Sequence, residues 1–187
     1  MKHQRGMLMI EVLISIFIAA IALLGMIGLS MKSSHNQMES FQRVQALTLV
    51  QDMVSRMNAN RQVAACYSDG ATGTVTTQTL PSCTVNIVAT STAAQQAMVN
   101  ADLAAWQSEL RGASEVNGTT NVGAMIGATG CIAQTDPVNN IYRITVAWQG
   151  LTSTVAPTLT CGKGNFGTND ALRRAVSVKI QIGNLTS

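Results

Sequence analysis

The first part of the chain is dominated by a long apolar run with a single charged position at its start. Residues 12–31 (VLISIFIAAIALLGMIGLSM) contain no ionisable side chain. The run matches the roughly 20 residues that a helix needs to cross the hydrocarbon core of a bilayer. Glu11 directly precedes it and is the only residue in the segment 7–31 that can carry a charge. The pattern predicts a membrane-spanning helix with a carboxylate near one end.

Basic residues in front of the run predict its orientation. Lys2 and Arg5 precede it, and the positive-inside rule therefore places the N-terminus in the cytoplasm. A cleaved secretory signal is an alternative, but Glu11 interrupts its apolar core. The run is also longer than the roughly 7–15 residues usual in such signals. The pattern favours a single-pass inner-membrane helix followed by a periplasmic domain.

Helical spacing continues after the apolar run, now with a polar face. No Pro or Gly occurs between Ser30 and Gln62, so one helix is expected to continue to about Asn60. Apolar residues at steps of 3 and 4 predict an amphipathic helix with one buried side. The predicted buried stripe comprises Phe41, Val44, Leu47, Val50, Val54 and Met57, with Gln45, Asp52, Ser55 and Arg56 on the other face.

The remainder of the chain predicts a loop, a second helix and then strands. Residues 68–91 are rich in Ser, Thr and Gly, and Gly112 is placed to end the second helix. That helix is predicted from apolar steps of 4, 3 and 4, at Val99, Leu103, Trp106 and Leu110. Period-2 alternation in IYRITVAWQG and RRAVSVKIQI predicts an antiparallel sheet with one solvent-facing side. The fold class is α+β, with the sheet packed on the amphipathic half of the first helix.

Composition and charge exclude several classes of function. Charged residues make up 11% of the chain, against roughly 25% in typical soluble proteins. No basic stripe accompanies the formal charge of +3, so direct binding of nucleic acid is not expected. Both histidines, His3 and His35, lie near the N-terminus, and no paired carboxylates flank a recognisable motif. No enzymatic activity, metal or cofactor is predicted. Arg173 and Arg174 are expected to form a solvated strand start, and Trp106 and Trp148 are expected in the core.

Four cysteines follow the membrane segment. An even number in an exported domain predicts disulfides, with reduced core cysteines as the alternative, and their spacing does not fit a zinc site. Chain order favours Cys66–Cys83 and Cys131–Cys161 among the three possible connectivities. Cys66 ends the long helix and Cys83 lies in the loop after it. Cys131 and Cys161 flank a strand, a turn through Gly150 and another expected short strand, which would bring them together near one sheet edge.

The N-terminal segment resembles a known signal. RGMLMIEVLISIFIAAIALLG resembles the class III signal of type IV prepilins, with a basic leader, a glycine, a hydrophobic residue and a glutamate at the fifth mature position. The resemblance implies that a membrane prepilin peptidase cuts between Gly6 and Met7 and methylates the new amine of Met7. Several downstream segments, including NQMESFQRVQALTLVQDMVSRMNANR and CGKGNFGTNDALRRAVSVKIQI, resemble the PilV family of minor pilins. That family implies a pilin-type fold and a structural role in pilus biogenesis.

Cleavage at this position would explain why a charged residue, Glu11, stands at membrane depth. The new amine of Met7 is a second charge at membrane depth, and Glu11 of one subunit can meet the amine of its neighbour. Pairing relieves both desolvation penalties only when the subunits assemble in one register. The alternative is that Glu11 snorkels to the cytoplasmic interface. That alternative explains why the charge is tolerated but not its fixed spacing from Gly6.

These observations predict a three-part chain and a structural function. The expected parts are a leader at 1–6, a membrane and assembly helix at 7–31, and a periplasmic domain at 32–187. We expect a minor pilin-like subunit that takes part in assembly or priming of type IV pili and passes from the inner membrane into the pilus. Its expected partners are other minor and major pilins, the prepilin peptidase and the inner-membrane assembly platform. The alternatives are a type II secretion pseudopilin, and a periplasmic enzyme or receptor with an uncleaved signal anchor.

Overall fold

The structure, a computed structural model, describes residues 9–68, 93–113, 116–121, 123 and 125–183. The chain separates into two units, Met1–Ser40 and Phe41–Ser187, each with its own internal contacts. Gly6, Met7 and Cys83 lie outside the described residues, so the cleavage site, the methylation and the Cys66–Cys83 bond stay predictions.

Helix α1 (Met9–Ala59) is one continuous element of 51 residues. The sequence of α1 contains no proline. A proline in the helix interior would remove a backbone hydrogen bond, and the proline ring would clash with the preceding turn. Glu11 lies in the first turn. The helix ends one residue before the position expected from the sequence, and the prediction of a single helix from the apolar run to about Asn60 is therefore confirmed.

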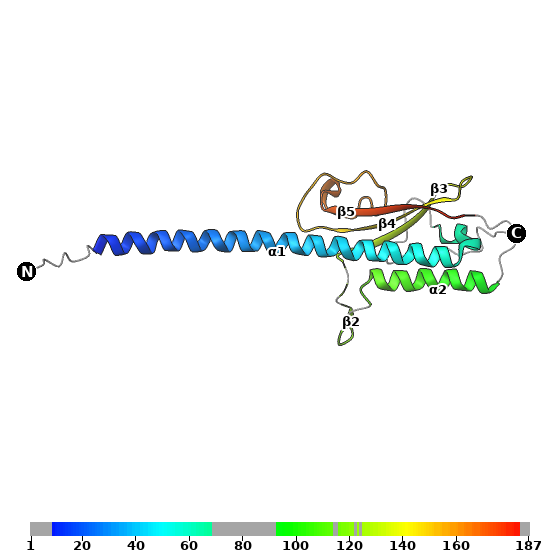
Figure 1. The fold of residues 1–187 in the computed structure, drawn as a ribbon, viewed down its shortest axis with the longest axis horizontal. Coiled ribbons are helices and arrows are strands. Elements are labelled where there is room, and N and C mark those ends of the chain that lie inside the picture. The colour runs from blue at the N-terminus through cyan, green and yellow to red at the C-terminus, as the bar shows by residue number, and fades with distance from the viewer. Residues whose placement is uncertain (1–8, 69–92, 114–115, 122, 124, 184–187) are drawn as a thin grey trace, which may run out of the picture. The chain divides into compact units, whose positions relative to one another are not determined.

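The second unit adds helices and antiparallel strands to the end of α1 (Figure 1). Its described elements are η1 (Arg61–Tyr67), α2 (Ala93–Leu110), β1 (Val116–Asn117), β2 (Thr120–Asn121), β3 (Thr129–Asp136), β4 (Ile141–Gln149), η2 (Thr168–Asp170) and β5 (Arg173–Gln181). β1 and β2 form a two-stranded hairpin, and β3, β4 and β5 form an antiparallel sheet in that order. The α+β prediction is confirmed.

Helix α2 ends as its sequence predicts. Gly112 has a φ of 77°, which glycine adopts without the steric cost that a Cβ would impose. The N–H of Gly112 donates to the carbonyl of Glu109 at 2.9 Å, and the N–H of Ala113 donates to the carbonyl of Ser108 at 3.1 Å. These two bonds form a Schellman motif, which satisfies carbonyls that the helix end would leave open.

Strand β3 has no period-2 signature in the sequence. Its first four residues, Thr129–Ile132, are all buried, so the alternation that marks a half-exposed strand is absent. It pairs with β4 so that Cys131 lies opposite Thr145, and the register shifts between Gln134 and Asp136. The sequence therefore predicts β4 and β5 but not the third strand of the sheet.

One hydrophobic core joins α1, α2 and the sheet within the second unit. α1 and α2 contribute Ala46, Leu49, Val50, Met53, Met57, Val99, Leu103, Trp106 and Leu110, and β4 contributes Tyr142, Ile144, Val146 and Trp148. In Figure 1, α2 and β5 lie on opposite sides of the C-terminal part of α1. The predictions that α2 buries its apolar stripe and that both tryptophans belong to the core are confirmed.

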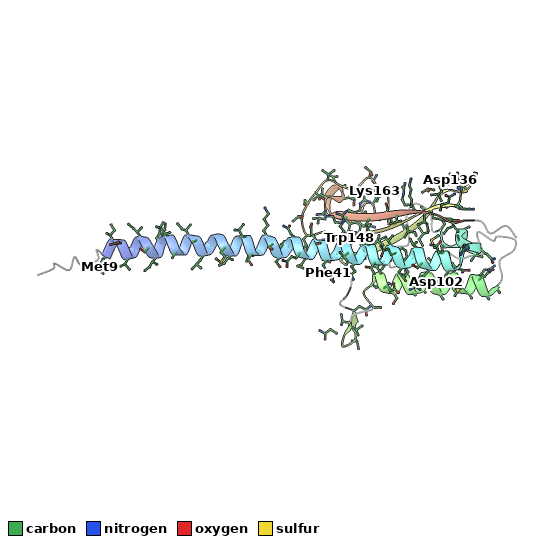
Figure 2. All side chains as sticks on the ribbon, viewed as in Figure 1. Met9, Phe41, Asp102, Asp136, Trp148 and Lys163 are labelled. Carbon is green, nitrogen blue, oxygen red and sulfur yellow. A yellow bond between two sulfur atoms is a disulfide. The ribbon has the colours of Figure 1, made fainter. Side chains whose placement is uncertain are left out.

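The buried side of α1 differs from the predicted stripe. Phe41, labelled in Figure 2, and Val44 are 67% and 59% exposed, and burial begins at Ala46. The polar face of α1 is only partly exposed to solvent. Helix α2 packs beside it, and Arg56 of α1 forms ion pairs with carboxylates of α2. Helical spacing identified an amphipathic helix, but the positions of its two non-local partners decide which residues are covered.

The outer face of the sheet is not fully solvent-facing, contrary to the sequence prediction. Thr145 and Ala147 of β4 are buried, and Ala147 packs with Cys131, Cys161 and Phe166 in a second small core. The segment between β4 and β5 covers this part of the sheet. It contains turns and η2, and the short strand expected between Gly150 and Cys161 is absent, although these residues are all described.

Candidate functional site

The first unit presents an apolar helix surface that no described residue buries. In the described part of the chain, α1 is the one helix long and apolar enough to cross a membrane. None of the residues in its most apolar window is buried. Its exposed large side chains include Ile10, Leu13, Ile16, Phe17, Leu23, Leu24, Ile27 and Leu29. A contiguous exposed apolar surface of this extent marks a membrane or protein contact.

Glu11 is the charged residue of this apolar surface. Its position in the first turn of α1 places a negative charge where the helix dipole favours one. Its backbone carbonyl accepts a hydrogen bond from the Ser15 hydroxyl at 2.7 Å. The ion pairs found among the described residues all belong to the second unit. Glu11 is thus held on a helix, and it lies four residues after Met7 in the sequence.

A disulfide fixes the segment between β4 and β5 to the sheet. Cys131 in β3 bonds to Cys161, with a Cα–Cα distance of 5.9 Å. This is the second of the two pairings that chain order favours. Cys66, in η1, is buried in the main core. The bond closes a long loop whose residues cover the outer face of β4.

The buried side chain of Arg173 also binds the segment between β4 and β5. Its side chain is 2% exposed. The guanidinium donates to the backbone carbonyls of Pro157 and Cys161 at 2.9 Å and also to that of Leu159, while its Nε lies 3.4 Å from the carboxylate of Asp170. The expectation of a solvated strand start is therefore wrong for this residue. A buried guanidinium needs several acceptors, and the disulfide-bound segment supplies them as backbone carbonyls.

Asp170 completes the arrangement from the turn before β5. Both of its carboxylate oxygens accept the N–H of Gly164 at 2.9 Å, and Oδ1 also accepts that of Phe166 at 3.4 Å. The Gly164 donor is the largest cause that holds the pKa of Asp170 below its ordinary value, and the Arg173 charge adds to it. The chain adopts a positive φ at Asp170, which Asp tolerates better than most residues.

A second polar cluster lies between α1 and α2. Arg56 pairs with Asp52 at 2.6 Å, with Glu109 at 2.9 Å and with Asp102 at 3.3 Å. The Tyr67 hydroxyl donates to Asp102 at 2.5 Å, and burial is the main cause that raises the pKa of Tyr67. Burial, followed by the charge of Asp52, also raises the pKa of Glu109. Three carboxylates share one guanidinium, so the cluster keeps an excess of negative charge.

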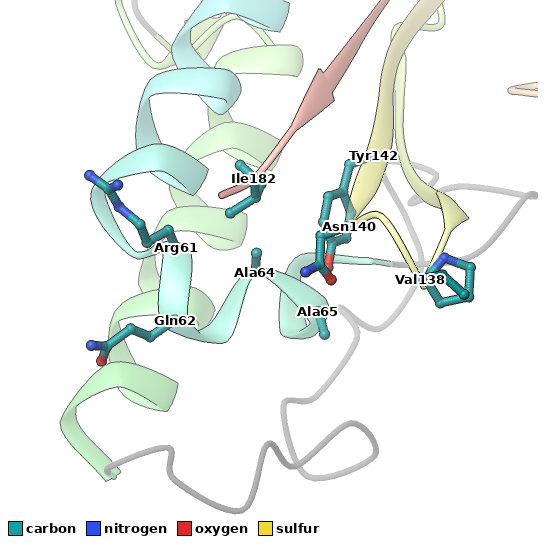
Figure 3. Close-up of a pocket in the computed structure, with 9 residues that line it drawn as sticks. Arg61, Gln62, Ala64, Ala65, Val138, Asn140, Tyr142 and Ile182 are labelled. Carbon is teal, nitrogen blue, oxygen red and sulfur yellow. The ribbon is translucent and has the colours of Figure 1, made fainter. Parts of the chain in front are cut away.

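A cleft lies between η1 and the turn that joins β3 to β4 (Figure 3). Ala64 and Ile182 line its middle, between η1 and Asn140. The side chains of Arg61 and Gln62 extend away from Asn140. The residues that line it include no His, Cys, Asp or Glu. Among the described residues, no group of three His, Cys, Asp or Glu side chains is placed to hold a metal ion. Among the described lining residues, the cleft therefore has no carboxylate, thiol or imidazole placed for nucleophilic or general-base chemistry.

Comparison with known proteins agrees with the helical part of this fold. Residues 28–104 match the family model described as Tt1218-like, type IV pilin Tt1218. The matched range starts inside α1 and ends inside α2. No curated protein and no solved structure matches the chain significantly. A long N-terminal apolar helix followed by a small antiparallel sheet is consistent with the type IV pilin fold, and the match supports a pilin-like structural subunit in general.

Proposed function

We propose that this chain is a minor pilin-like structural subunit of the PilV kind, which enters type IV pili through α1 and takes part in their assembly or priming. The observation that carries the proposal is the uncovered apolar half of α1 with Glu11 in its first turn, in a chain whose residues 28–104 match a type IV pilin model. An apolar helix of this length fits first the bilayer and then a bundle of similar helices.

The proposal includes processing at the N-terminus. The prepilin peptidase cuts between Gly6 and Met7 and methylates the Met7 amine, which leaves a cationic amine at the start of the helix. Glu11 of one subunit then pairs with the Met7 amine of the next. Breaking a buried ion pair by removing one partner costs roughly 3–5 kcal/mol. Subunits that assemble out of register leave both charges unpaired and are disfavoured by this amount.

Replacing Glu11 tests the proposal, with Ser15 as the matched control. Both side chains lie on the exposed apolar half of α1, one turn apart, and only Glu11 carries a charge. Glu11→Val should leave the protein in the membrane, because it removes a charge from an apolar span. Its amount in sheared fibres should fall at least about tenfold, since each incorporated subunit would leave a buried amine unpaired. Ser15→Val should enter fibres normally. Equal incorporation of the two variants would contradict the assembly role of Glu11.

A further inference from the structure

Two cations face each other across β4 and β5. The register of these strands places Arg143 directly opposite Lys179. Residues in this relation project from the same face of the sheet with Cβ atoms roughly 4.5–5.5 Å apart, and like charges placed so destabilise the sheet. Tyr142 and Ile144 on either side of Arg143 are buried in the core. Arg143 and Lys179, which we call the cationic pair, therefore belong to the outer face.

The described residues do not neutralise the cationic pair. None of the ion pairs found in the described part of the chain includes Arg143 or Lys179. Asp136 is the carboxylate nearest to them in the strand register, opposite Ile141. Its oxygens already accept the backbone N–H groups of Val138 and Asn139 at 2.9 and 3.1 Å and the Asn139 amide at 2.7 Å. Within the described part of the chain, two like charges thus face each other on the sheet without an ion-pair partner, and this arrangement fits an external anion.

The same unit carries an acidic surface on its two helices. Asp52, Asp102 and Glu109 form an acidic cluster around Arg56, with side chains 34%, 17% and 33% exposed. Three carboxylates and one guanidinium give −3 + 1 = −2. Among the described residues, Arg56 is the one cation within ion-pair distance of these carboxylates. The cluster lies on α1 and α2, whereas the cationic pair lies on the face of the sheet that is turned away from the hydrophobic core.

We propose that the cationic pair of one copy docks on the acidic cluster of a second copy of this chain. The inference rests on the proposed function, to which it adds the partner and the contact surface. The two patches are different surfaces of one unit, so the contact is heterologous. Such a contact repeats along an open series of subunits unless the rotation closes a ring. Complementary charge also fixes register and raises the association rate.

Zero-length crosslinking of the full-length protein detects this contact. An equimolar mixture of isotopically light and heavy protein in detergent is treated with a carbodiimide, which joins a lysine amine to a carboxylate in direct contact. Mass spectrometry of the peptides should find Lys179 joined to Asp52, Asp102 or Glu109 in mixed light–heavy pairs. These pairs should disappear at high salt because exposed charges are screened. Crosslinks of Lys179 that join only light to light and heavy to heavy peptides, or none to these carboxylates, would overturn the proposal.

Charge reversal gives a second, quantitative test. Arg143→Glu combined with Lys179→Glu should weaken self-association of the full chain at least about tenfold, because like charges across an interface cost several kcal/mol. Lys163→Glu is the control, since this exposed lysine lies in the loop between β4 and β5 and outside the cationic pair. Mixing the double variant with an Asp52→Lys, Glu109→Lys protein, whose cluster carries −2 + 4 = +2, should restore association between the two. The neutral variant Arg143→Gln with Lys179→Gln keeps the test valid if either reversal fails to fold.

The outcome separates this inference from the proposed function. If the double reversal and Lys163→Glu associate equally well, docking through the cationic pair is overturned, while the Glu11 experiment still decides the role of α1. If Glu11→Val enters fibres normally but the crosslink is found, the second-copy contact stands and the account of α1 fails.

Discussion

The indole of Trp106 in α2 lies so close to Gly130 in β3 that a Cβ on this glycine would fall 2.3 Å from the ring carbon Cη2. The ring is also held by its Nε1–H, which donates to the backbone carbonyl of Leu49 in α1 at 2.9 Å. One side chain therefore joins both helices to the sheet. This contact requires glycine for its small size, because the space for a methyl group is already filled.

Gly130→Ala should lower the free energy of unfolding by about 1–3 kcal/mol, as expected for overpacking a close-packed core. Gly183 is the matched control, since a Cβ there would meet nothing within 4 Å. Thermal unfolding of the full-length protein in detergent measures both variants. A Gly130→Ala protein that melts with the wild type and with Gly183→Ala would show that the indole can move aside at no cost.

Arg173→Met should destabilise the second unit by about 3–5 kcal/mol, because it leaves a buried carboxylate and several buried carbonyls without their donor. Arg174→Met is the control in the adjacent position. Arg174 donates to Thr152 and Thr154 at the exposed surface, where such contacts are worth about 0–1 kcal/mol. Urea unfolding of both variants and limited proteolysis between residues 150 and 172 provide the comparison. Equal stability of the two variants would show that Arg173 does not hold the segment between β4 and β5 in place.

Asp170 predicts a pH dependence in the acid range. Its pKa is lower in the folded state than in the unfolded chain because Gly164 and Phe166 donate to the carboxylate. Its contribution to stability is therefore fully present above the unfolded pKa and is lost as the pH falls through the lower, folded pKa. Asp170→Asn should reduce the melting temperature at neutral pH and flatten its dependence on pH below the usual aspartate range. Parallel curves for wild type and variant would show that Asp170 does not carry the effect.

Removal of the disulfide should weaken the second unit without abolishing a specific chemistry. Cys131 and Cys161 are 30 residues apart, and the chain-entropy model gives about 3–4 kcal/mol for a loop of this size. The Cys131→Ser, Cys161→Ser protein should therefore melt earlier and accumulate to a lower level in the membrane. Lower accumulation with unchanged melting would indicate that the bond acts in export instead of in the folded state.

Local patterns predicted the elements of this chain better than their contacts. The apolar run, the continuous α1 and the end of α2 at Gly112 depend on residues near one another in sequence, and each was predictable. The buried face of α1 depends on where α2 and the sheet dock. The sequence prediction that Phe41 and Val44 belong to the buried stripe is therefore wrong.

The missed parts of the second unit have a similar cause. β3 lacks alternation because both of its faces are covered. The burial of Arg173 depends on carbonyls at 157–161 that only the folded segment brings together. The cationic pair was also beyond sequence reasoning, since it exists only through the register of β4 and β5.

The mass and N-terminal sequence of the chain recovered from sheared surface fibres test the pilin-like function. If the protein is a pilin-like subunit, the fibre fraction should contain a chain that begins at Met7 and has a methylated amine. Gly6→Val should keep the leader and stay in the membrane fraction. A chain that retains Met1 and is found only in membranes would contradict a pilin-like function and favour a signal-anchored periplasmic protein.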